Sequence, residues 1–415
     1  EFLISIRNDE YLSNRVVIIV ERKDVIYKLT ANVEILWGVY KIYKKGHNLG
    51  RCVLNMCENE VFVMKTIRAL IGMLLLISVL FVGCGGKNVP DDAKNLDGND
   101  EDSLTIEDYY PFKENMKMDY QGVGNEFAEK RVFFEFIGEN RGQIKVYNPG
   151  TVVVSVLEYK DGELREIFSQ GEFYHIENML NINNGDSNII LKEPLKIGTS
   201  WDTFGGYKRS ITGIDVDIET PYGNFKALEV TTELGEGRNQ ADYYVKGIGH
   251  VASIYRDGEF EVKSLLERLE YEPDRVNIGF YYPMYEDIKV AYIEKSIEFN
   301  TNDSIEKILE ENLKKSGRDD LLASIPENVK INSILLDRGN QMVRVDFSNE
   351  LITEMNVGSA MESTILKSIV NTLGNYYNVE KVYISTEGKP YTSGHISIDK
   401  DEYFTVDYSE IENIN

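Results

Sequence analysis

The sequence predicts an α+β protein of two domains: an N-terminal antiparallel β-rich domain, built as a strongly curved sheet or a sandwich, and a C-terminal small α/β domain. Short alternating segments rich in β-branched and aromatic residues fill residues 109–273. Helix-period patterns follow beyond that region, within residues 274–415. The part of the chain beyond residue 83 is long enough for two sizeable cores.

Residues 64–83 have the features of an export signal. Lys65 and Arg68 form a basic start, an almost unbroken apolar run follows, and a glycine stands directly before Cys84. The apolar run is too short to span a membrane comfortably, since a spanning helix needs about 20 apolar residues. We therefore expect residues 64–83 to be a signal peptide.

The leader before Met64 is unusual for an exported protein, whose signal normally stands at the N-terminus. Its own apolar run, Val16–Val20, is short and is closed by charged residues, so it cannot act as the signal. We expect residues 1–63 to result from translation of DNA upstream of the true start codon, which is the codon of Met64. Two cysteines and one histidine in this leader fall short of the four ligands that a structural zinc needs.

Residues Phe81–Cys84 resemble a bacterial lipobox, although Phe81 stands where leucine is usual. The resemblance implies that Cys84 bears a lipid thioether, that the chain is cleaved just before it, and that a further acyl chain such as palmitate is added. The alternative is an uncleaved anchor helix. Both place the rest of the chain outside the membrane, on its extracytoplasmic surface, with the membrane as a partner through the lipid on Cys84.

The part beyond the signal is strongly acidic. Residues 1–83 hold 11 Lys and Arg and 8 Asp and Glu, so the remainder carries −27 where the whole chain carries −24. Nucleic acid is therefore not an expected partner, because phosphate binding needs a basic patch. Apart from Cys84 this part has no cysteine, which excludes disulfides and a thiol nucleophile. Residues 84–108 are small, polar and acidic, as in a linker, and lack the spacing of an EF-hand.

The β-rich domain, residues 109–273, is predicted from alternating segments that turn signals such as Asn148-Pro149-Gly150 and Asp257-Gly258 separate. Pro194–Trp201 and Tyr243–Val251 look like segments of exported β-rich domains of bacterial lipoproteins, and the glycines of the second predict a turn. The predicted strands are 131–137, 143–147, 151–157, 164–168, 210–218, 225–230 and 241–245.

Candidate sites in this domain are few. Asp215, Asp217 and Glu219 alternate on one strand and share a face, which is either a solvent face or one wall of a glycoside-hydrolysing site. The histidines lie apart, without a serine elbow or an HExxH helix. We therefore expect no catalytic residue, metal or cofactor. Three aromatic side chains either pack in the core or line an apolar pocket: Trp201, Tyr243 and Tyr244.

The last region, residues 274–415, predicts a different architecture. An amphipathic helix with a Ser304 or Asp303 cap and a second, longer helix alternate with strands. A hairpin is expected around Asp337-Arg338-Gly339-Asn340. In order, the predicted elements are strands 276–283 and 288–299, helix 304–315, strands 329–336 and 341–347, helix 359–377 and strand 379–385.

This order and these residues resemble the GerM domain of sporulation and spore germination proteins. The family implies a small α/β domain related to ring-building modules, used in envelope assemblies between the two membranes of a developing spore and not known as an enzyme. The residues that carry the resemblance include Tyr282, Pro283, Pro326, Asp346, Ser348, Gly358, Asn371, Thr372, Leu373 and Gly388.

Structural roles explain these motif residues from chemistry alone. Asn371 and Thr372, inside an apolar helix, are expected to hydrogen-bond a neighbouring loop. Asp346 is expected to brace the end of the hairpin, and Gly358 to permit the turn into the helix.

The sequence thus predicts a lipid-anchored extracytoplasmic protein that acts without catalysis as a binding or assembly component in sporulation or spore germination. Its expected partners are envelope or sporulation proteins, or further copies of itself through sheet edges or a helix flank. One alternative is a solute- or lipid-binding lipoprotein whose β domain encloses an apolar ligand. The other is an enzyme that acts on the cell wall through Asp215 or Asp217.

Overall fold

The structure, a computed structural model, describes residues 3–8, 15–22, 25–32, 105–182, 187–285 and 288–414. The chain divides into two compact units, Glu1–Asp100 and Glu101–Asn415. In the first unit β1 (Leu3–Asn8), β2 (Arg15–Arg22) and β3 (Val25–Asn32) form an antiparallel sheet with β2 in the middle. The apolar run Val16–Val20 of the leader thus lies in the central strand.

The second unit begins with a short helix, α3 (Ile106–Tyr109), which a capping box involving Thr105 and Asp108 starts. Ile106 is only 2% exposed and belongs to the core of the sheet that follows. The folded part therefore starts within the segment that composition indicates as a linker, because Ile106 and Tyr109 supply apolar surface among acidic neighbours.

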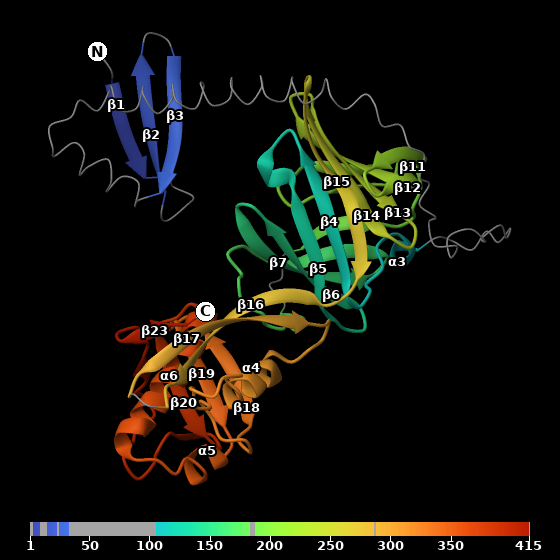
Figure 1. Ribbon diagram of the computed structural model, residues 1–415. Helices are drawn as coiled ribbons and strands as arrows, with labels where there is room; N and C mark the ends of the chain where they lie inside the picture. Colours follow the sequence, from blue (N-terminus) through green and yellow to red (C-terminus); the bar gives the residue numbers. More distant parts are fainter. Residues whose placement is uncertain are drawn as a thin grey trace, which may run out of the picture. The chain divides into compact units, whose positions relative to one another are not determined.

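The β-rich part is one antiparallel sheet of twelve strands in the order β10-β11-β12-β13-β14-β15-β4-β5-β6-β7-β8-β9 (Figure 1). Of the two arrangements predicted from the sequence, the single curved sheet is the one formed. The strands are β4 (Met116–Val123), β5 (Lys130–Ile137), β6 (Arg141–Asn148), β7 (Thr151–Lys160), β8 (Glu163–Gln170), β9 (Asn188–Lys192), β10 (Ser200–Asp202), β11 (Lys208–Thr220), β12 (Gly223–Gly235), β13 (Arg238–Val245), β14 (Gly249–Asp257) and β15 (Phe260–Tyr271).

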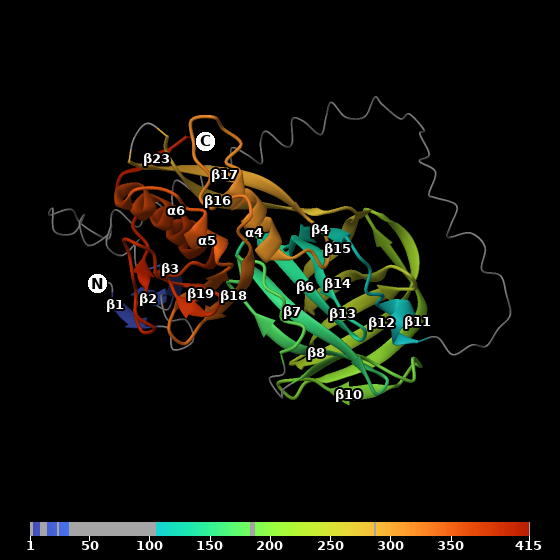
Figure 2. The same ribbon diagram turned by 90° about the horizontal axis from the view of Figure 1, so that it is seen from below.

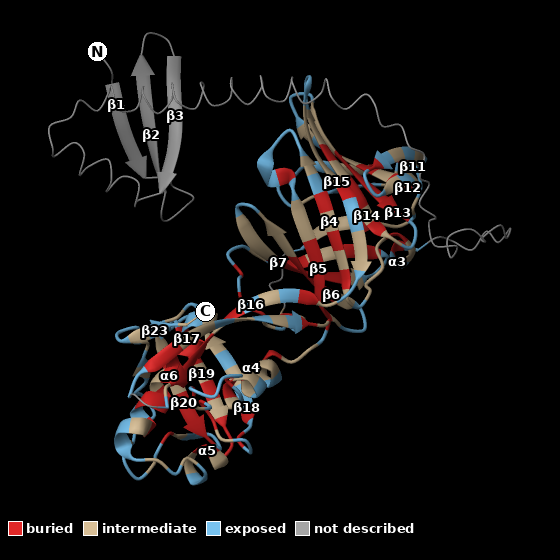
Figure 3. Ribbon diagram, viewed as in Figure 1, coloured by how far each residue is buried: buried red, intermediate tan, exposed pale blue. Residues whose placement is uncertain are grey.

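Curvature brings the two ends of this sheet together. The indole Nε1 of Trp201 in β10 donates a hydrogen bond of 3.0 Å to the carbonyl of Ile189 in β9, and Nη1 of Arg209 donates one of 2.7 Å to the same oxygen. Side chains on the inner face form an apolar core, visible as buried residues in Figure 3. The 3₁₀ helix η3 (Glu126–Ala128) links β4 to β5.

The C-terminal part contains two smaller sheets. One has the order β16-β17-β23, and the other has the order β18-β19-β20-β21, with β22 paired to β20. The strands are β16 (Asp274–Pro283), β17 (Val290–Phe299), β18 (Ile331–Asp337), β19 (Met342–Phe347), β20 (Lys381–Thr386), β21 (Lys389–Pro390), β22 (Phe404–Thr405) and β23 (Ile411–Asn413); the helices are α4 (Ile305–Lys314), α5 (Glu350–Thr353) and α6 (Ser359–Tyr377).

Helix α6 lies between the two sheets of the C-terminal part (Figure 2). Twelve of its residues are buried, which is more than one stripe of a helix can supply. One side of α6 contacts β16, since Oγ1 of Thr372 accepts a hydrogen bond from the backbone N–H of Tyr281. Ile369 and Leu373 lie in one apolar core with Val345 and Val382 of the second sheet. A helix held between two sheets must be apolar on both sides.

The predicted elements of this part are all present. Helix α4 starts after Ser304, whose hydroxyl accepts a hydrogen bond of 3.2 Å from the N–H of Lys307, as an N-cap should. Helix α6 has the predicted bounds. The hairpin of β18 and β19 turns at Asp337–Asn340, where Oδ1 of Asp337 accepts from the N–H of Asn340.

Candidate functional site

The predicted motif residues of the C-terminal part lie in its frame rather than in a pocket. Asp346 shows this most clearly. Its Oδ1 accepts hydrogen bonds from Oγ of Ser385 at 2.6 Å and from the N–H of Gly388 at 2.8 Å, and its Oδ2 accepts one from Nδ2 of Asn332 at 2.9 Å. Burial opposes ionisation, but these donors hold the pKa of Asp346 below its usual value. The carboxylate fastens β18 and the β20–β21 turn to β19, which is the bracing role predicted for it.

Asn371 and Thr372 join helix α6 to its surroundings. Nδ2 of Asn371 donates to the carbonyl of Asp407 at 2.7 Å, and Oδ1 accepts from the N–H of Asp407 at 3.0 Å. Oγ1 of Thr372 donates to the carbonyl of Ser368 and accepts from Tyr281. Asn371 therefore binds a neighbouring loop, as predicted, whereas the partner of Thr372 is a strand.

Tyr282 and Pro283 lie at the end of β16. The hydroxyl of Tyr282 donates to the carbonyl of Asn312 at 2.6 Å and accepts from Nζ of Lys295 at 2.7 Å, which ties the strand to the end of α4. The carbonyl of Pro283 accepts from the N–H of Leu322. Both residues hold β16 against the segment that follows α4.

The remaining motif residues have turn and core positions. Ser348 exchanges hydrogen bonds with the backbone of Lys330, Pro326 accepts from the N–H of Val329, and Leu373 is 0% exposed. Gly388 has a φ of +73°, which favours glycine in the turn between β20 and β21.

Gly358 differs from the expectation, because it caps α6 with a φ of −75° and a Cβ there would meet open space. Glycine is thus not needed to permit this turn.

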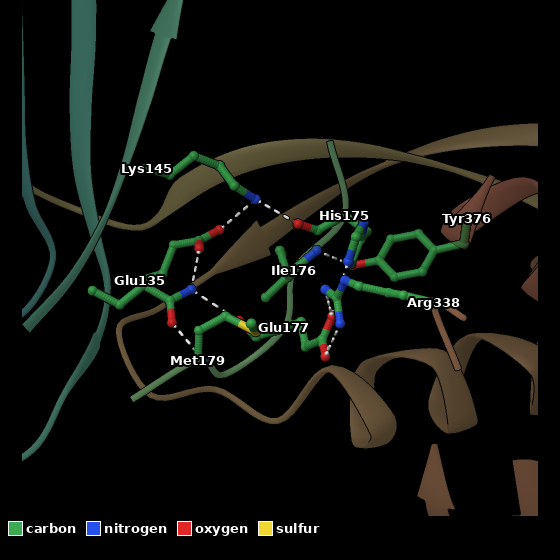
Figure 4. A network of polar contacts seen from close by, with 9 residues as sticks. Glu135, Lys145, His175, Ile176, Glu177, Met179, Arg338 and Tyr376 are labelled. Atoms are coloured by element: carbon green, nitrogen blue, oxygen red, sulfur yellow. Dashed lines mark hydrogen bonds and ion pairs between the residues drawn. The ribbon is translucent and has the colours of Figure 1, made fainter. Parts of the chain in front are cut away.

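A polar network on the outer face of the β-rich sheet was not predicted (Figure 4). Nζ of Lys145 in β6 lies 2.6 Å from Oε1 of Glu135 in β5, and both side chains are almost fully buried. Nε2 of Gln143 donates to Oε2 of Glu135 at 2.9 Å. These side chains then bind the backbone of residues 171–182, the segment that follows β8: Lys145 donates to the carbonyl of His175, and Gln143 accepts from the N–H of Met179.

The same 171–182 segment contacts the C-terminal part. The N–H of Ile176 donates to the hydroxyl of Tyr376 in α6 at 2.8 Å. The guanidinium of Arg338, in the β18–β19 turn, binds the carboxylate of Glu177, to which Nε2 of His175 also lies at 3.0 Å (Figure 4). Burial raises the pKa of Glu177, but hydrogen bonds from His175 and Arg338 outweigh this effect and bring the pKa below its usual value. The 171–182 segment is therefore hydrogen-bonded to the β-rich sheet on one side and to the C-terminal part on the other.

A second polar contact joins β5 and the residue just before β4 to the turn after β17. Oγ1 of Thr301 accepts from the N–H of Asn115 at 2.7 Å and donates to the carbonyl of Phe134 at 2.6 Å. The N–H of Asn302 donates to the carbonyl of Glu135. Phe136 of the sheet packs edge-on against Phe299 at 5.9 Å between ring centroids, so apolar and polar contacts alternate along this boundary.

Residues 280–392 match the family model named Germane, described as sporulation and spore germination. These residues are similar to the Germane family, and we refer to this part of the chain as the Germane domain. The match confirms the family resemblance that the sequence indicates.

Solved structures resemble parts of the chain. A Bacteroides fragilis protein with a YmcC-like fold is 14% identical over 39% of this chain and 98% of its own, with a TM-score of 0.27. The tandem GerMN domains of the sporulation protein GerM from Bacillus subtilis are 18% identical over 31% of this chain and 46% of theirs, with a TM-score of 0.24. The first GerMN domain alone is 17% identical, over 31% of this chain and 99% of its own, with a TM-score of 0.23. No curated protein sequence matches the chain.

Outside the Germane domain, the predicted carboxylates lie at the surface. Asp215 has a φ of +57° at an irregularity of β11, so the regular alternation with Asp217 is interrupted there. Asp217 is 84% exposed and pairs with Lys226. These positions are those of a solvent face.

The three aromatic candidates pack in the core of the sheet: Trp201, Tyr243 and Tyr244 are 6%, 5% and 4% exposed. Gly247 and Gly249 have φ values of +75° and +107° in the β13–β14 turn, which confirms the predicted turn.

Cys84, the signal segment and most of the acidic linker lie outside the described residues. Within residues 105–182, 187–285 and 288–414, no group of three or more His, Cys, Asp or Glu side chains is placed to hold a metal ion. In the same described ranges, no helix combines the length and the apolar character that crossing a membrane requires.

Proposed function

We propose that the protein is a non-catalytic binding or assembly component of sporulation or spore germination, held on the extracytoplasmic face of the membrane by a lipid on Cys84. The Germane match over residues 280–392 is the observation that carries this proposal. The palmitoylated anchor rests on the likeness of Phe81–Cys84 to a lipobox.

The placement of the motif residues supports a binding role for the domain surface. The polar side chains of the motif form hydrogen bonds within the domain. These residues are Tyr282, Asp346, Ser348, Asn371 and Thr372. These side chains therefore stabilise the fold of the domain and do not form a ligand site. Envelope or sporulation proteins, or further copies of the chain, would bind to exposed faces of the domain.

The bonded 171–182 segment supports a role for the β-rich sheet in presenting the Germane domain. Lys145 and Gln143 hold the segment on one side, and Tyr376 and Arg338 hold it on the other. An assembly component gains from such a connection, because a domain of fixed orientation loses less freedom when its partner binds.

Deletion of the coding gene tests the function directly. We expect fewer heat-resistant spores, or spores that germinate slowly, and restoration of both by the complete protein. Spores of normal number and normal germination rate would contradict the proposed role.

The anchor is tested by metabolic labelling with a fatty acid. We expect the label on the wild-type protein and its loss in Cys84→Ser, whereas Ser103→Ala, in the linker that follows Cys84, serves as the control and should keep the label. Unlabelled wild-type protein would exclude the lipid on Cys84 while leaving the deletion test intact.

A further inference from the structure

A cavity of about 100 Å³ lies on the inner face of the β-rich sheet, between β4, β5, β6 and the β13–β14 turn. We call it the inner cavity. Its wall is mostly apolar. The residues that line it include Tyr110, Met116, Met118, Tyr120, Lys130 and Val132.

Lys130 is the unusual member of this wall. Successive side chains of a strand point to opposite faces, so Lys130 shares the inner face of β5 with Val132 and Phe134. Its ammonium Nζ lies 4.8 Å from the centroid of the Tyr120 ring. In the part of the chain that the structure describes, no carboxylate or other acceptor forms an ion pair or hydrogen bond with it.

The other polar groups near Lys130 are already paired. Oη of Tyr120 donates to the carbonyl of His250 at 2.7 Å, and Nε2 of His250 lies 3.2 Å from Oδ1 of Asp242. Tyr110 is the exception, because its hydroxyl has no hydrogen-bond partner among the described residues. Lys130 and Tyr110 are both half-buried, so the wall offers one ammonium and one phenol that bond no other group of the described residues.

Lys130 is half-buried, and this burial lowers the pKa of its ammonium, with the charge of Asp242 opposing the shift. An anion that entered the cavity would replace lost hydration with a charge-assisted hydrogen bond. The ammonium of Lys130 therefore favours a negatively charged group over a neutral one.

The volume limits the apolar portion of such a ligand. An engineered cavity of about 150 Å³ holds benzene, so by proportion the inner cavity, at about 100 Å³, holds a group of roughly four carbon atoms. The chain of a long fatty acid would not fit.

We propose that the inner cavity binds a small aliphatic carboxylate, with its carboxylate on Nζ of Lys130 and Oη of Tyr110 and its short apolar tail against Met116, Met118 and Val132. The site is independent of the Germane domain. It would remain if the role in sporulation proved wrong.

Calorimetric titration of the full chain with pentanoate tests this site, with 1-pentanol as the neutral analogue of equal length. We expect pentanoate to bind about ten times more tightly than 1-pentanol or better, since a charged hydrogen bond contributes about 1.5–3 kcal/mol. Lys130→Met should weaken pentanoate binding by a similar factor, and Lys160→Met, at an exposed position of β7, should leave it unchanged.

Three results would overturn the proposal: no heat of binding with pentanoate, equal affinity for pentanoate and 1-pentanol, or full affinity in Lys130→Met. The comparison of the two ligands needs only the wild-type chain, so it decides the matter even if the variant fails to fold. Circular dichroism of Lys130→Met establishes whether the variant is folded, and thus whether its pentanoate affinity can be compared with that of the wild-type chain.

Discussion

The guanidinium of Arg338 donates to both carboxylate oxygens of Glu177, at 3.2 and 2.7 Å, and so ties the β18–β19 turn of the Germane domain to the 171–182 segment of the β-rich part. Two parallel hydrogen bonds of this kind fix direction as well as distance. Both side chains retain some exposure, 38% for Arg338 and 24% for Glu177, which limits the energy of the pair.

Replacing Arg338 by Met should lower the free energy of unfolding by about 1 kcal/mol, because a partly exposed ion pair contributes little more. Urea unfolding of Arg338→Met, Glu177→Gln and the double variant measures the coupling, which we expect to be about 0.5–1 kcal/mol. Arg318→Met is the control, since Arg318 pairs with Asp320 in its own loop. Independent effects at residues 338 and 177 would contradict the pairing.

Lys145→Met should be far more destabilising, by about 3–5 kcal/mol, because it leaves the carboxylate of Glu135 buried without its cation. Removing both charges in Lys145→Met/Glu135→Leu should recover part of the loss. Thermal or urea unfolding measures both variants, and Lys196→Met, at an exposed lysine, provides the control. A double variant less stable than Lys145→Met would argue against an uncompensated charge as the cause.

Asn371→Ala should loosen the C-terminal segment, because the backbone of Asp407 then loses both partners. Leaving these groups unsatisfied should cost about 1–3 kcal/mol. Hydrogen exchange should show faster exchange at the amide of Asp407. Asn375→Ala, at an exposed position of the same helix, should leave that amide protected; equal protection in both variants would show that Asn371 does not hold the segment.

The stability of the protein should fall as the pH drops below about 6.5. Burial lowers the pKa of His250 from 6.5, the hydrogen bond to Asp242 opposes the shift, and the charge of Lys130 adds to it. The unfolded chain therefore takes up a proton before the folded one, so this contribution is complete above pH 6.5 and declines on acidification. Asp242 stays ionised in this window, since its pKa lies below the usual value despite burial, through its bond to His250.

Urea unfolding at several pH values measures this slope. His250→Asn keeps a hydrogen-bonding side chain without a titrating ring and should flatten the decline. His395→Asn, at an exposed histidine, should not. A decline of the same steepness in His250→Asn would assign it to other groups.

Local sequence patterns sufficed to predict most of the secondary structure of the Germane domain. Ser304 and the apolar spacing behind it predict α4, and the turn residues from Asp337 to Asn340 predict the hairpin, because each signal lies within a few residues of the structure that it forms. Asp346 and Asn371 could likewise be given structural roles, since a polar side chain in an apolar setting must find a partner.

The buried polar network could not be predicted in the same way. Glu135, Gln143 and Lys145 alternate with apolar residues and so read as a solvent face. The 171–182 segment and α6, far away in sequence, cover them. The one local sign was Glu135 between Phe134 and Phe136. Lys130 was missed for the opposite reason, because a charged residue at the start of a strand gives no indication that it faces inward.

The chain passes from β15 to β16 across only Glu272 and Pro273, and the N–H of Glu272 donates to the carbonyl of Asn115. Such a crossing leaves no slack for a hinge. Rotation of the β-rich sheet would therefore rotate the Germane domain with it. A partner bound to one of the two parts would then restrict the motion of the other.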